Sequence, residues 1–239
     1  MKAAVYFGSR HIYADMISAV KSLLRNSDVE KIYLLIEDDD LPCPLPPIVE
    51  VRNISTVISK YFDPNGPNYN TIWTPMGLTR AVLPFIFPDI DYILSLDCDT
   101  IVDKDISDLW DFDLTGCYFA AAVEPVLSAK LGQMYTNSGV VLMNLRMLRD
   151  GKTDDIIRAL NRRKYLYVTQ DAFNYRCQGY IRELPSDYNV AFCTKPTENK
   201  KIIHYAADKN WRNYDLVRKY RDMTWEEVLR EHPDSSTDL

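Results

Sequence analysis

The order of apolar and polar residues along the chain predicts strands that alternate with helices. Residues 3–7 form an apolar run typical of a strand, and over residues 12–24 apolar side chains recur at helical spacing. Residues 31–36 and 48–54 again have the pattern of strands. A strand, a helix and a strand in this order predict a parallel sheet with helices packed on its faces.

The pattern continues along the chain and predicts a single α/β domain. Further strands are predicted at residues 92–96, 117–123, 138–145 and 201–205, and further helices at residues 77–87, 154–161, 170–177, 216–221 and 225–231. No repeat or change of composition marks a linker. We therefore expect one domain over residues 1–232 and a polar, disordered tail over residues 233–239.

Proline modifies this pattern in two places. The predicted helix at residues 77–87 contains Pro84 and is followed by Pro88, so we expect it to end early or to kink. Residues 62–75 are rich in Asn, Pro and Gly and are too many for a tight turn. Loops of this length often cover or bind a ligand, and we expect this one to select the acceptor.

The composition indicates a folded chain in a reducing compartment. The 239 residues are 46% hydrophobic, enough for a sizeable core, which excludes a disordered or collagen-like chain. The five cysteines are scattered without a Cys-x-x-Cys pair, which argues against disulfides and against a structural zinc site. No apolar stretch approaches the ~18 residues of a spanning helix, and no secretion signal opens the chain, so we expect a cytoplasmic protein.

The charge balance narrows the range of partners. Lys and Arg number 28 against 34 Asp and Glu, which gives a formal charge of −6. A general nucleic-acid-binding protein needs a basic field to attract phosphates, so we expect no nucleic-acid partner. Any phosphate group that the chain binds must be met by a few placed cations or by a metal ion.

Asp97 and Asp99 are the sharpest local feature. They follow an apolar strand, and residues i and i+2 of an extended chain point the same way, so both carboxylates can face one site. Ligands of open α/β sheets bind at the carboxyl ends of strands, and paired carboxylates there suit Mg²⁺ or Mn²⁺ held jointly with a phosphate. For an isolated Asp-x-Asp, aspartates that cap or precede a helix near Ile106 are an equally good explanation.

The same segment is similar to the opening motif of the haloacid-dehalogenase phosphatases, in which the first Asp is a nucleophile and the second an acid or base. That motif has its threonine two positions after the second Asp, whereas Thr100 is adjacent to Asp99. It also lies on the first strand and is followed later by a Gly-Asp acidic cluster. Neither condition is met, so a phosphatase is the less favoured prediction.

Segments in a fixed order along the chain resemble glycosyltransferase family 8, the group that includes glycogenin and bacterial lipopolysaccharide galactosyl- and glucosyltransferases. The matching segments are residues 83–110, Asn137-Ser138-Gly139-Val140 with Asn144, Gln170-Asp171 with Asn174, and Ile203-His204-Tyr205 with Lys209 and Trp211. No single segment is specific, but together they are.

The resemblance implies a GT-A fold, which is a Rossmann-like αβα sandwich. It also implies transfer of a hexose from UDP-glucose or UDP-galactose, with retention at the anomeric carbon, to a glycan, a lipid-linked sugar or a protein. In this family the motif at Asp97, Cys98 and Asp99 binds Mn²⁺, or Mg²⁺, with the UDP diphosphate, and His204 matches a third metal ligand. A metal that bridges both phosphates neutralises the charge that develops on the departing UDP.

Other positions match residues with further roles in the family. The implied donor-binding residues are Gly8, Ser9 and Tyr13 at the uridine, Arg80 and Lys209 at the diphosphate, and Ser138 beneath the sugar, and the implied catalytic residues are Asn137, Gln170, Asp171 and Glu124. Gly8 and Gly139 would let the backbone approach the ligand closely. Each of four residues has an ordinary alternative: a surface aromatic for Tyr13, a helix-surface cation for Arg80, a strand-end charge for Glu124 and a core histidine for His204.

The chain departs from the family at several positions. Arg10 stands where many members have Asp or Asn, and Thr169 replaces the first Asp of an Asp-Gln-Asp run. The segment from His204 to Lys209 is one residue shorter than usual, and Ala207 occupies the place of a glycine. These departures keep open an alternative from another class, a sugar-nucleotide-binding protein that does not transfer the sugar.

Two further expectations concern mechanism and surface. The amide of Gln170 is a poor nucleophile, so we expect a same-face reaction in which the leaving phosphate oxygen helps to deprotonate the acceptor hydroxyl. Residues 209–221 mix Lys and Arg with aromatic side chains. Such a segment either docks as a helix through its aromatic face or touches an anionic membrane, so we expect at most a peripheral membrane contact.

Overall fold

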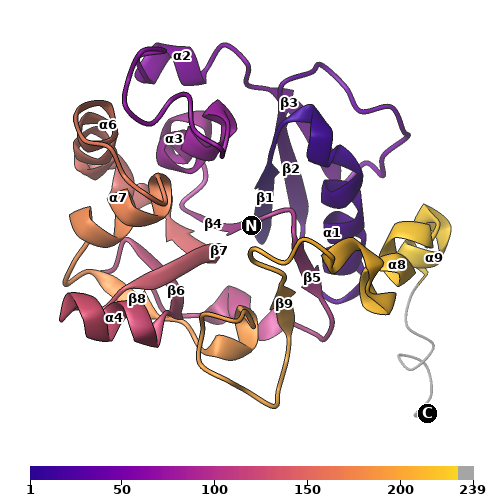
Figure 1. Ribbon diagram of the computed structural model, residues 1–239. Coiled ribbons are helices and arrows are strands. Elements are labelled where there is room, and N and C mark those ends of the chain that lie inside the picture. Colours follow the sequence, from indigo (N-terminus) through magenta and orange to yellow (C-terminus); the bar gives the residue numbers. More distant parts are fainter. Residues whose placement is uncertain (231–239) are drawn as a thin grey trace.

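One seven-stranded sheet organises the computed structural model, which describes residues 1–230 (Figure 1). Its strand order is β3-β2-β1-β4-β7-β6-β8, and β7 runs antiparallel to both of its neighbours while the other pairs are parallel. The strands are β1 (Ala3–Phe7), β2 (Lys31–Ile36), β3 (Val49–Asn53), β4 (Tyr92–Leu96), β6 (Phe119–Val123), β7 (Thr136–Asn144) and β8 (Ile181–Glu183).

A second, two-stranded sheet joins distant parts of the sequence. It consists of β5 (Thr100–Val102) and β9 (Ile202–His204), which pair antiparallel. Because β5 follows β4 after a short turn, the small sheet lies next to the C-terminal end of β4. The last quarter of the described chain is thereby fixed next to the end of β4.

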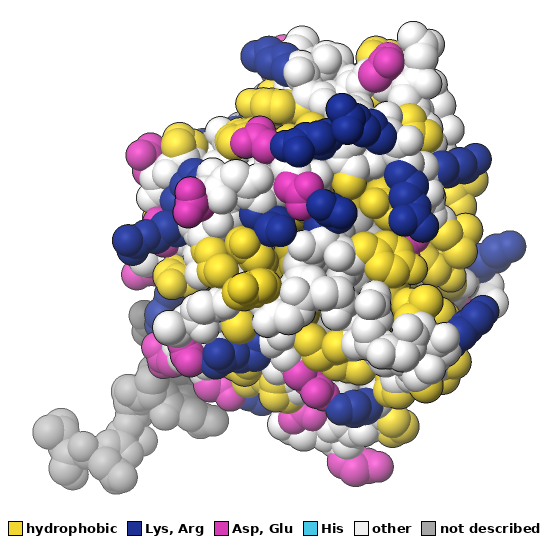
Figure 2. Space-filling model, turned by 90° about the vertical axis from the view of Figure 1, so that its left-hand side faces the viewer, with side chains coloured by type: hydrophobic (Ala, Val, Ile, Leu, Met, Phe, Trp, Pro, Cys, Tyr) yellow, Lys and Arg dark blue, Asp and Glu magenta, His cyan; other side chains and the backbone are white. Residues whose placement is uncertain are grey.

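Helices cover both faces of the large sheet (Figure 1). One layer contains α1 (Tyr13–Arg25), α8 (Asp215–Asp222) and α9 (Trp225–Leu229). The other contains α2 (Ile58–Tyr61), α3 (Thr79–Ile86), α5 (Leu145–Arg149), α6 (Lys152–Arg162) and α7 (Thr169–Arg176), while α4 (Pro125–Leu131) lies beside β6 and β8. Figure 2 views the face formed by α6, α7 and α4, where Lys and Arg side chains gather across the upper part and apolar side chains lie between them.

Alternation along the strands produces the two core layers. Ala3 and Val5 of β1 pack in the layer beneath α3, whereas Ala4 and Tyr6 pack beneath α1. The buried face of α1 repeats at helical spacing through Met16, Ala19, Val20 and Leu23, all fully buried. The alternation along β1 and the helical repeat along α1, both visible in the sequence, therefore mark the side chains that the fold buries.

Several predicted elements are confirmed and some were missed. The strands predicted at residues 3–7, 31–36 and 92–96 have those bounds in the structure. The elements that sequence analysis missed are α2, β5, α4, α5 and β8, each of seven residues or fewer. Such segments are too short for a hydrophobic period to stand out. The predicted tail at residues 233–239 and the end of the last predicted helix lie outside the described residues.

Of the two outcomes expected from Pro84, an early end or a kink, the early end is wrong. The helix α3 continues past Pro84 to Ile86. Proline lacks the N–H that would bond to the carbonyl four residues before it, so the loss falls on the carbonyl of Arg80. In a helix of eight residues this is one missing bond, and the buried apolar residues before the proline, Ala81, Val82 and Leu83, anchor the helix in the core.

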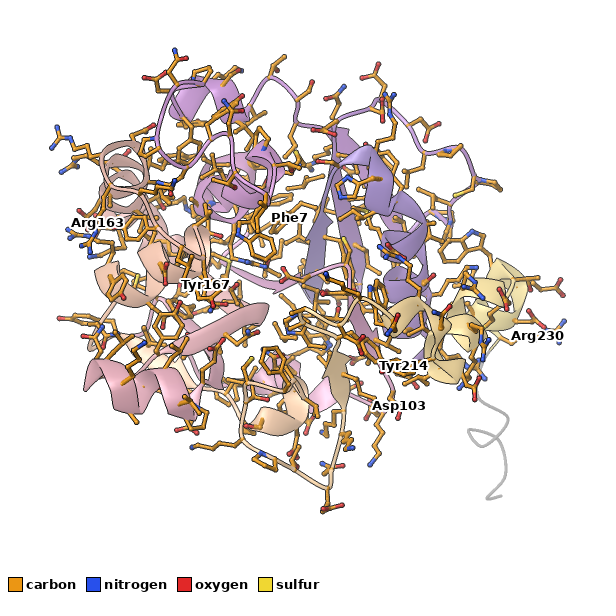
Figure 3. All side chains as sticks on the ribbon, in the orientation of Figure 1. Phe7, Asp103, Arg163, Tyr167, Tyr214 and Arg230 are labelled. Carbon is orange, nitrogen blue, oxygen red and sulfur yellow. The ribbon has the colours of Figure 1, made fainter. Side chains whose placement is uncertain are left out.

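The C-terminal helices dock on α1, as the docked-helix alternative expects. Tyr220 and Trp211 are buried, and the ammonium group of Lys21 donates to the carbonyl oxygens of Arg221 and Met223. Tyr214, labelled at the right of Figure 3, stays half exposed. Within residues 1–230, no helix combines the length and the apolarity needed to cross a bilayer.

Candidate active site

The two aspartates of the Asp-x-Asp motif lie beside a histidine from a late strand. A tight turn leads from Asp97, which follows β4, through Asp99 into β5. In the β5–β9 pair Thr100 lies opposite His204, which brings the imidazole to the aspartates. Nε2 of His204 is 3.3 Å from Oδ1 of Asp99 and 3.9 Å from Oδ2 of Asp97. Ligand atoms of the three side chains lie within 4.8 Å of one another, a spacing suited to a divalent cation.

Asp97 and Asp99 do not cap the helical turn that follows them, which was the ordinary alternative. That turn begins at Ser107, and the N–H of Ser107 donates to Oδ1 of Asp105 at 3.0 Å. Asp97 instead accepts a hydrogen bond from Arg80. The aspartate that accepts from the first N–H of the turn is therefore Asp105, and the first two aspartates keep carboxylate oxygens for another partner.

Gly139 of β7 makes room for the imidazole. A Cβ atom at this position would overlap ring atoms of His204. The sequence suggested that Gly139 admits a ligand, but the neighbour that needs the space is His204. The carbonyl of Gly139 also accepts from the N–H of Asp97 at 2.8 Å. One glycine thus sets the distance between the first aspartate and the histidine.

Burial and charge act in opposite directions on the histidine and its nearest aspartate. His204 is 6% exposed; burial lowers its pKa, but the Asp99 and Asp97 carboxylates outweigh burial and the pKa is raised. Burial would raise the pKa of Asp99, but the charge of His204 and its hydrogen bond leave that pKa lowered. Each group therefore stabilises the charged form of the other, and the cluster favours carboxylates that are ionised and ready to act as ligands.

Arg80 is a buried cation beside this cluster, so the helix-surface alternative is wrong. Its side chain is 4% exposed, and Nη2 donates to Oδ1 of Asp97 at 2.8 Å. Nε donates to Oγ of Ser95 at 3.1 Å, and the guanidinium lies 5.0 Å from the centre of the Phe7 ring. Arg80 thus fixes one oxygen of Asp97, while the other oxygen faces His204.

Gly8 and Ser9 lie where β1 ends. A Cβ atom on Gly8 would come within 2.8 Å of Cγ1 of Ile12, so the glycine is required by the packing of the chain itself rather than by a ligand alone. Ser9 is 8% exposed and shares a hydrogen bond of 3.0 Å with the hydroxyl of Thr74. The turn after β1 is therefore held against the end of the loop at residues 62–75.

Tyr13 is buried at the start of α1, so the surface-aromatic alternative is wrong. Its hydroxyl donates to Oδ2 of Asp38 at 3.0 Å and accepts from the N–H of Glu37 at 3.1 Å. Burial and the carboxylate of Asp38 raise the pKa of Tyr13. Arg10 pairs with the same carboxylate. Together these residues hold the acidic loop after β2 beside the end of β1.

A hydrogen-bonded network connects four of the predicted catalytic and sugar-binding residues. Oε1 of Glu124 accepts from Nδ2 of Asn137 at 2.9 Å and from Nε2 of Gln170 at 3.2 Å. Oε1 of Gln170 accepts from the N–H of Ser138 at 2.9 Å. Glu124 is 6% exposed, so it is not the strand-end surface charge of the ordinary alternative. Its carboxylate is instead the acceptor that orients two amide side chains.

Asp171 belongs to the same buried region. It is 7% exposed, and it accepts from the hydroxyl of Tyr135 at 2.5 Å and from the N–H of Tyr167 at 2.9 Å. Burial and this hydrogen bond raise the pKa of Tyr135. Figure 3 shows Tyr167 nearer the middle of the molecule than Arg163, which lies at its left edge. Asp171 therefore ties the segment before α7 to the network.

Three predicted positions are placed differently from the rest. The thiol of Cys98 points into the core and donates to the carbonyl of Phe7 at 3.5 Å, so only its backbone faces the side of Asp97 and Asp99. Lys209 is exposed and forms no ion pair with any described residue. Thr169, in place of the aspartate of the family, donates to the carbonyl of Gly77 at 3.1 Å.

Sequence analysis missed Asn189, which is fully buried between two site residues. Its Oδ1 lies 3.0 Å from Nδ1 of His204, and its Nδ2 donates to Oδ1 of Asn137 at 2.9 Å. Its only signal in the sequence is a polar residue between Tyr188 and Val190. Such a residue is ordinary in a loop, and its position relative to β9 and β7 is set by tertiary structure.

The strained backbone of the described chain is concentrated around this site. Three non-glycine residues have positive φ: Thr74 at 57°, Val168 at 40° and Ala207 at 61°. Thr74 contacts Ser9, Val168 precedes α7, and Ala207 follows β9. Left-handed backbone costs an L-residue about 1–2 kcal/mol. Strain of this kind persists where the surroundings fix the chain, and it is frequent in functional sites.

Comparison with known proteins gives a consistent result. The sequence profile of Glycosyl transferase family 8 matches residues 37–215. The lipopolysaccharide 1,2-glucosyltransferase of Escherichia coli is 29% identical over 55% of this chain and 48% of its own length. The glycosyltransferase GlyE of Streptococcus pneumoniae is 26% identical over 96% of this chain and 63% of its own length. The chain thus spans between about half and two thirds of these two curated relatives.

Solved structures support the predicted fold. The crystal structure of GlyE superposes with a TM-score of 0.72 at 22% identity and covers 95% of this chain and 62% of that one. The galactosyltransferase LgtC, crystallised with donor and acceptor sugar analogues, gives a TM-score of 0.69 at 16% identity and covers 92% of this chain and 95% of that one. The αβα sandwich of GT-A type is confirmed, and the matched family is not that of the haloacid-dehalogenase phosphatases.

Proposed function

Because this chain belongs to glycosyltransferase family 8, we propose that it transfers a hexose from UDP-glucose or UDP-galactose to an acceptor, with retention and with a divalent metal ion. The observation that carries the proposal is the meeting of Asp97, Asp99 and His204 at the end of β4, with Arg80 beside them. Carboxylate ligands and a buried cation are what a metal-bound diphosphate requires.

The residues fit a resident Mn²⁺ or Mg²⁺. Asp97, Asp99 and His204 would hold the ion, and Gly139 leaves the space that the imidazole occupies. When bound, the ion supplies charge neutralisation to the diphosphate leaving group. Arg80 adds a permanent positive charge, and its bond to Asp97 keeps that carboxylate from turning away. The mixed set of carboxylates and imidazole supports Mn²⁺ over Mg²⁺, which prefers oxygen ligands alone.

We place the donor between the turn after β1 and the carboxyl end of β4. Gly8, Ser9 and Tyr13 would line the uridine, and Lys209, which is exposed, is free to reach a diphosphate. Ser138 and Asn137 would lie beneath the sugar. The backbone of Cys98 would lie beside the donor at the carboxyl end of β4.

The network supports a same-face reaction over a double displacement. Both ends of the Gln170 amide are engaged, by Ser138 and by Glu124, so the amide is held as a positioning group rather than as a nucleophile. Asp171 is engaged by Tyr135 and by a backbone N–H. The leaving phosphate oxygen would then accept the proton of the acceptor hydroxyl on the face that the departing UDP leaves. A covalent glycosyl adduct trapped on Gln170 or Asp171 would contradict this.

The acceptor is proposed to lie against two neighbouring loops. Asn68 bonds to the carbonyls of Leu160 and Arg163, so the loop at residues 62–75 packs on the segment between α6 and α7. Large apolar side chains on these loops are exposed, namely Ile72, Trp73, Leu166 and Tyr167. Such side chains suit the apolar faces of sugar rings, and we propose a saccharide acceptor, free or linked to a lipid or protein.

UDP release tests the proposed function. The protein would be incubated with UDP-glucose or UDP-galactose and Mn²⁺, with and without a chelator, and UDP would be quantified. We expect release from at least one donor, loss of release with the chelator and recovery with added Mn²⁺. If UDP binds but neither donor is turned over, the binding-only alternative is correct, and the departures at Thr169 and Ala207 become its explanation.

A further inference from the structure

A line of buried side chains leads from the backbone of β7 to the metal-facing histidine. Oδ1 of Asn137 accepts from the N–H of Gly139 at 2.9 Å and from Nδ2 of Asn189 at 2.9 Å. The other end of the Asn189 amide lies 3.0 Å from Nδ1 of His204. Asn137 and His204 are 6% exposed and Asn189 is fully buried, so water does not compete for these bonds.

The chemistry of the two fixed ends determines the direction of every bond in this line. The N–H of Gly139 can only donate, so the atom of Asn137 that faces it must be the oxygen. The carboxylate of Glu124, at the other side of Asn137, accepts, which requires the amide nitrogen there. The contacts with Gly139 and with Glu124 therefore assign the oxygen and nitrogen of the Asn137 amide in the same way.

The same argument extends to the imidazole ring of His204. The oxygen of Asn137 accepts, so the atom of Asn189 that contacts it must be the amide nitrogen. The amide oxygen of Asn189 is then the atom that faces His204. An amide oxygen accepts, so Nδ1 of His204 must carry a proton. Without a metal ion Nε2 also faces an acceptor, the Asp99 carboxylate at 3.3 Å, and can carry a proton. When a cation replaces that proton, the ring keeps its proton on Nδ1 and the lone pair of Nε2 is directed at the cation between Asp97 and Asp99.

We infer that Asn189 is a positioning residue that holds His204 as the Nδ1–H tautomer and aims the free Nε2 lone pair at the metal position. The inference rests on the proposed function in that it supplies the ligand tautomer that a cation needs. Gly139 acts at both ends, since its N–H sets the amide direction and its missing Cβ admits the ring. Partners of this kind commonly change metal affinity about 10- to 100-fold when removed.

The tautomer can be measured without donor or acceptor. Histidine labelled with ¹⁵N would be incorporated, and the ring nitrogens observed by NMR in the presence of excess Mg²⁺, which is diamagnetic. The chain has three histidines, so the His204 signal is assigned by its absence in His204→Ala. We expect a protonated Nδ1 and an unprotonated Nε2 when the ion is bound. A ring whose only proton is on Nε2 would overturn the inference, and protons on both nitrogens would show that the ion does not bind at His204, which would refute the proposed metal site.

Two variants of Asn189 separate its acceptor role from its packing role. Asn189→Leu removes the acceptor, and we expect a mixture of tautomers and a 10- to 100-fold loss of Mn²⁺ affinity, measured by electron paramagnetic resonance. Asn189→Asp keeps an acceptor for Nδ1–H but cannot donate to Asn137, so we expect the wild-type tautomer in a less stable protein. A wild-type tautomer population in Asn189→Leu would contradict the inference.

Asn68→Leu is the matched control. Asn68 is 2% exposed and bonds to three backbone groups, at Leu160, Arg163 and Tyr165, away from the histidine. It should lose stability as Asn189→Leu does and leave the tautomer of His204 unchanged. If the tautomer is as inferred and Mn²⁺ fails to bind, the proposed metal site is wrong; if Mn²⁺ binds while the proton is on Nε2, the positioning inference is wrong.

Discussion

The two halves of the large sheet bury different kinds of side chain. In β1 and β2 the buried residues are almost all apolar: Val5 packs in the layer beneath α3, and Leu34 packs in the layer beneath α1. Around β6, β7 and α7 the buried residues include Glu124, Asn137 and Asp171. Burying such groups costs free energy unless each finds a partner, and among the described residues Thr79 alone keeps a buried polar side-chain atom without one.

This difference separates the part that makes the fold stable from the part that makes it specific. Apolar burial contributes stability in proportion to area and tolerates small adjustments. A buried polar network has few acceptable arrangements, because every donor must meet an acceptor. The first half should therefore respond to mutation in stability and the second half in metal binding and turnover.

The largest effect is expected from the metal-facing cluster. Asp97→Asn or His204→Ala should reduce metal-dependent UDP release about 1,000-fold, equal to about 4 kcal/mol of activation free energy, because a ligand is lost. Circular dichroism should show that each variant stays folded. Asp113→Asn is the matched control, since Asp113 pairs with Arg182 on the surface. Full activity in either cluster variant would refute the metal assignment.

Mutation of the apolar half, β1 and β2, is expected to lower the free energy of unfolding strongly and to leave Mn²⁺ affinity unchanged. Leu34→Ala removes a fully buried side chain that packs beneath α1, and deletions of this kind cost about 2–5 kcal/mol. Urea unfolding would measure the loss. Mn²⁺ affinity of the folded protein should stay within twofold of the wild type. A much weaker affinity would mean that the two halves are not separate in function.

A smaller, mixed effect is expected where the two roles meet. Gly139→Ala would force a methyl group into the ring of His204, at a cost of about 1–3 kcal/mol, and Mn²⁺ affinity should fall with stability. Thermal unfolding and metal titration would record both. In a His204→Ala background the added methyl should cost far less, because the ring is gone. Equal costs in both backgrounds would show that the ring is not what the glycine accommodates.

The smallest effect is expected at the strained turn after β9. Ala207 has a φ of 61°, and glycine adopts this region without the Cβ penalty. Ala207→Gly should therefore raise the free energy of unfolding by up to about 1 kcal/mol. Chemical denaturation would detect the change. A loss of stability would show that Ala207 makes contacts that outweigh the strain, and the comparison with the glycine of the family would fail.

The sequence predicted the fold where a period extends over enough residues. β1, β2 and β4 have the predicted bounds because uninterrupted apolar runs can only be buried strands in this context. The three-residue strands β5 and β8 could not be found, since three residues show no period. Their pairing is decided by neighbours far away in the sequence.

The candidate site, like the fold, was predictable only where its signal is local in the sequence. Asp97 and Asp99 could be picked out from their local spacing, and both do face one site. The expected reason was wrong, because residues 97–99 form a tight turn in which the N–H of Thr100 donates to the carbonyl of Asp97, and not an extended chain. His204 entered through family resemblance, because no local rule connects it to residues 97–99. Asn189 was missed, since its role depends on two contacts that exist only after β7 and β9 have met.

The short sheet of β5 and β9 has a consequence for the order of synthesis. A ribosome that has made the two aspartates must still add about another hundred residues before His204 can pair opposite Thr100. Until then a nascent chain offers a cation two carboxylates and no imidazole. A cation that binds the finished cluster stabilises only the completed fold, by mass action. A cation at the proposed site would thus stabilise the protein only after β9 has paired with β5.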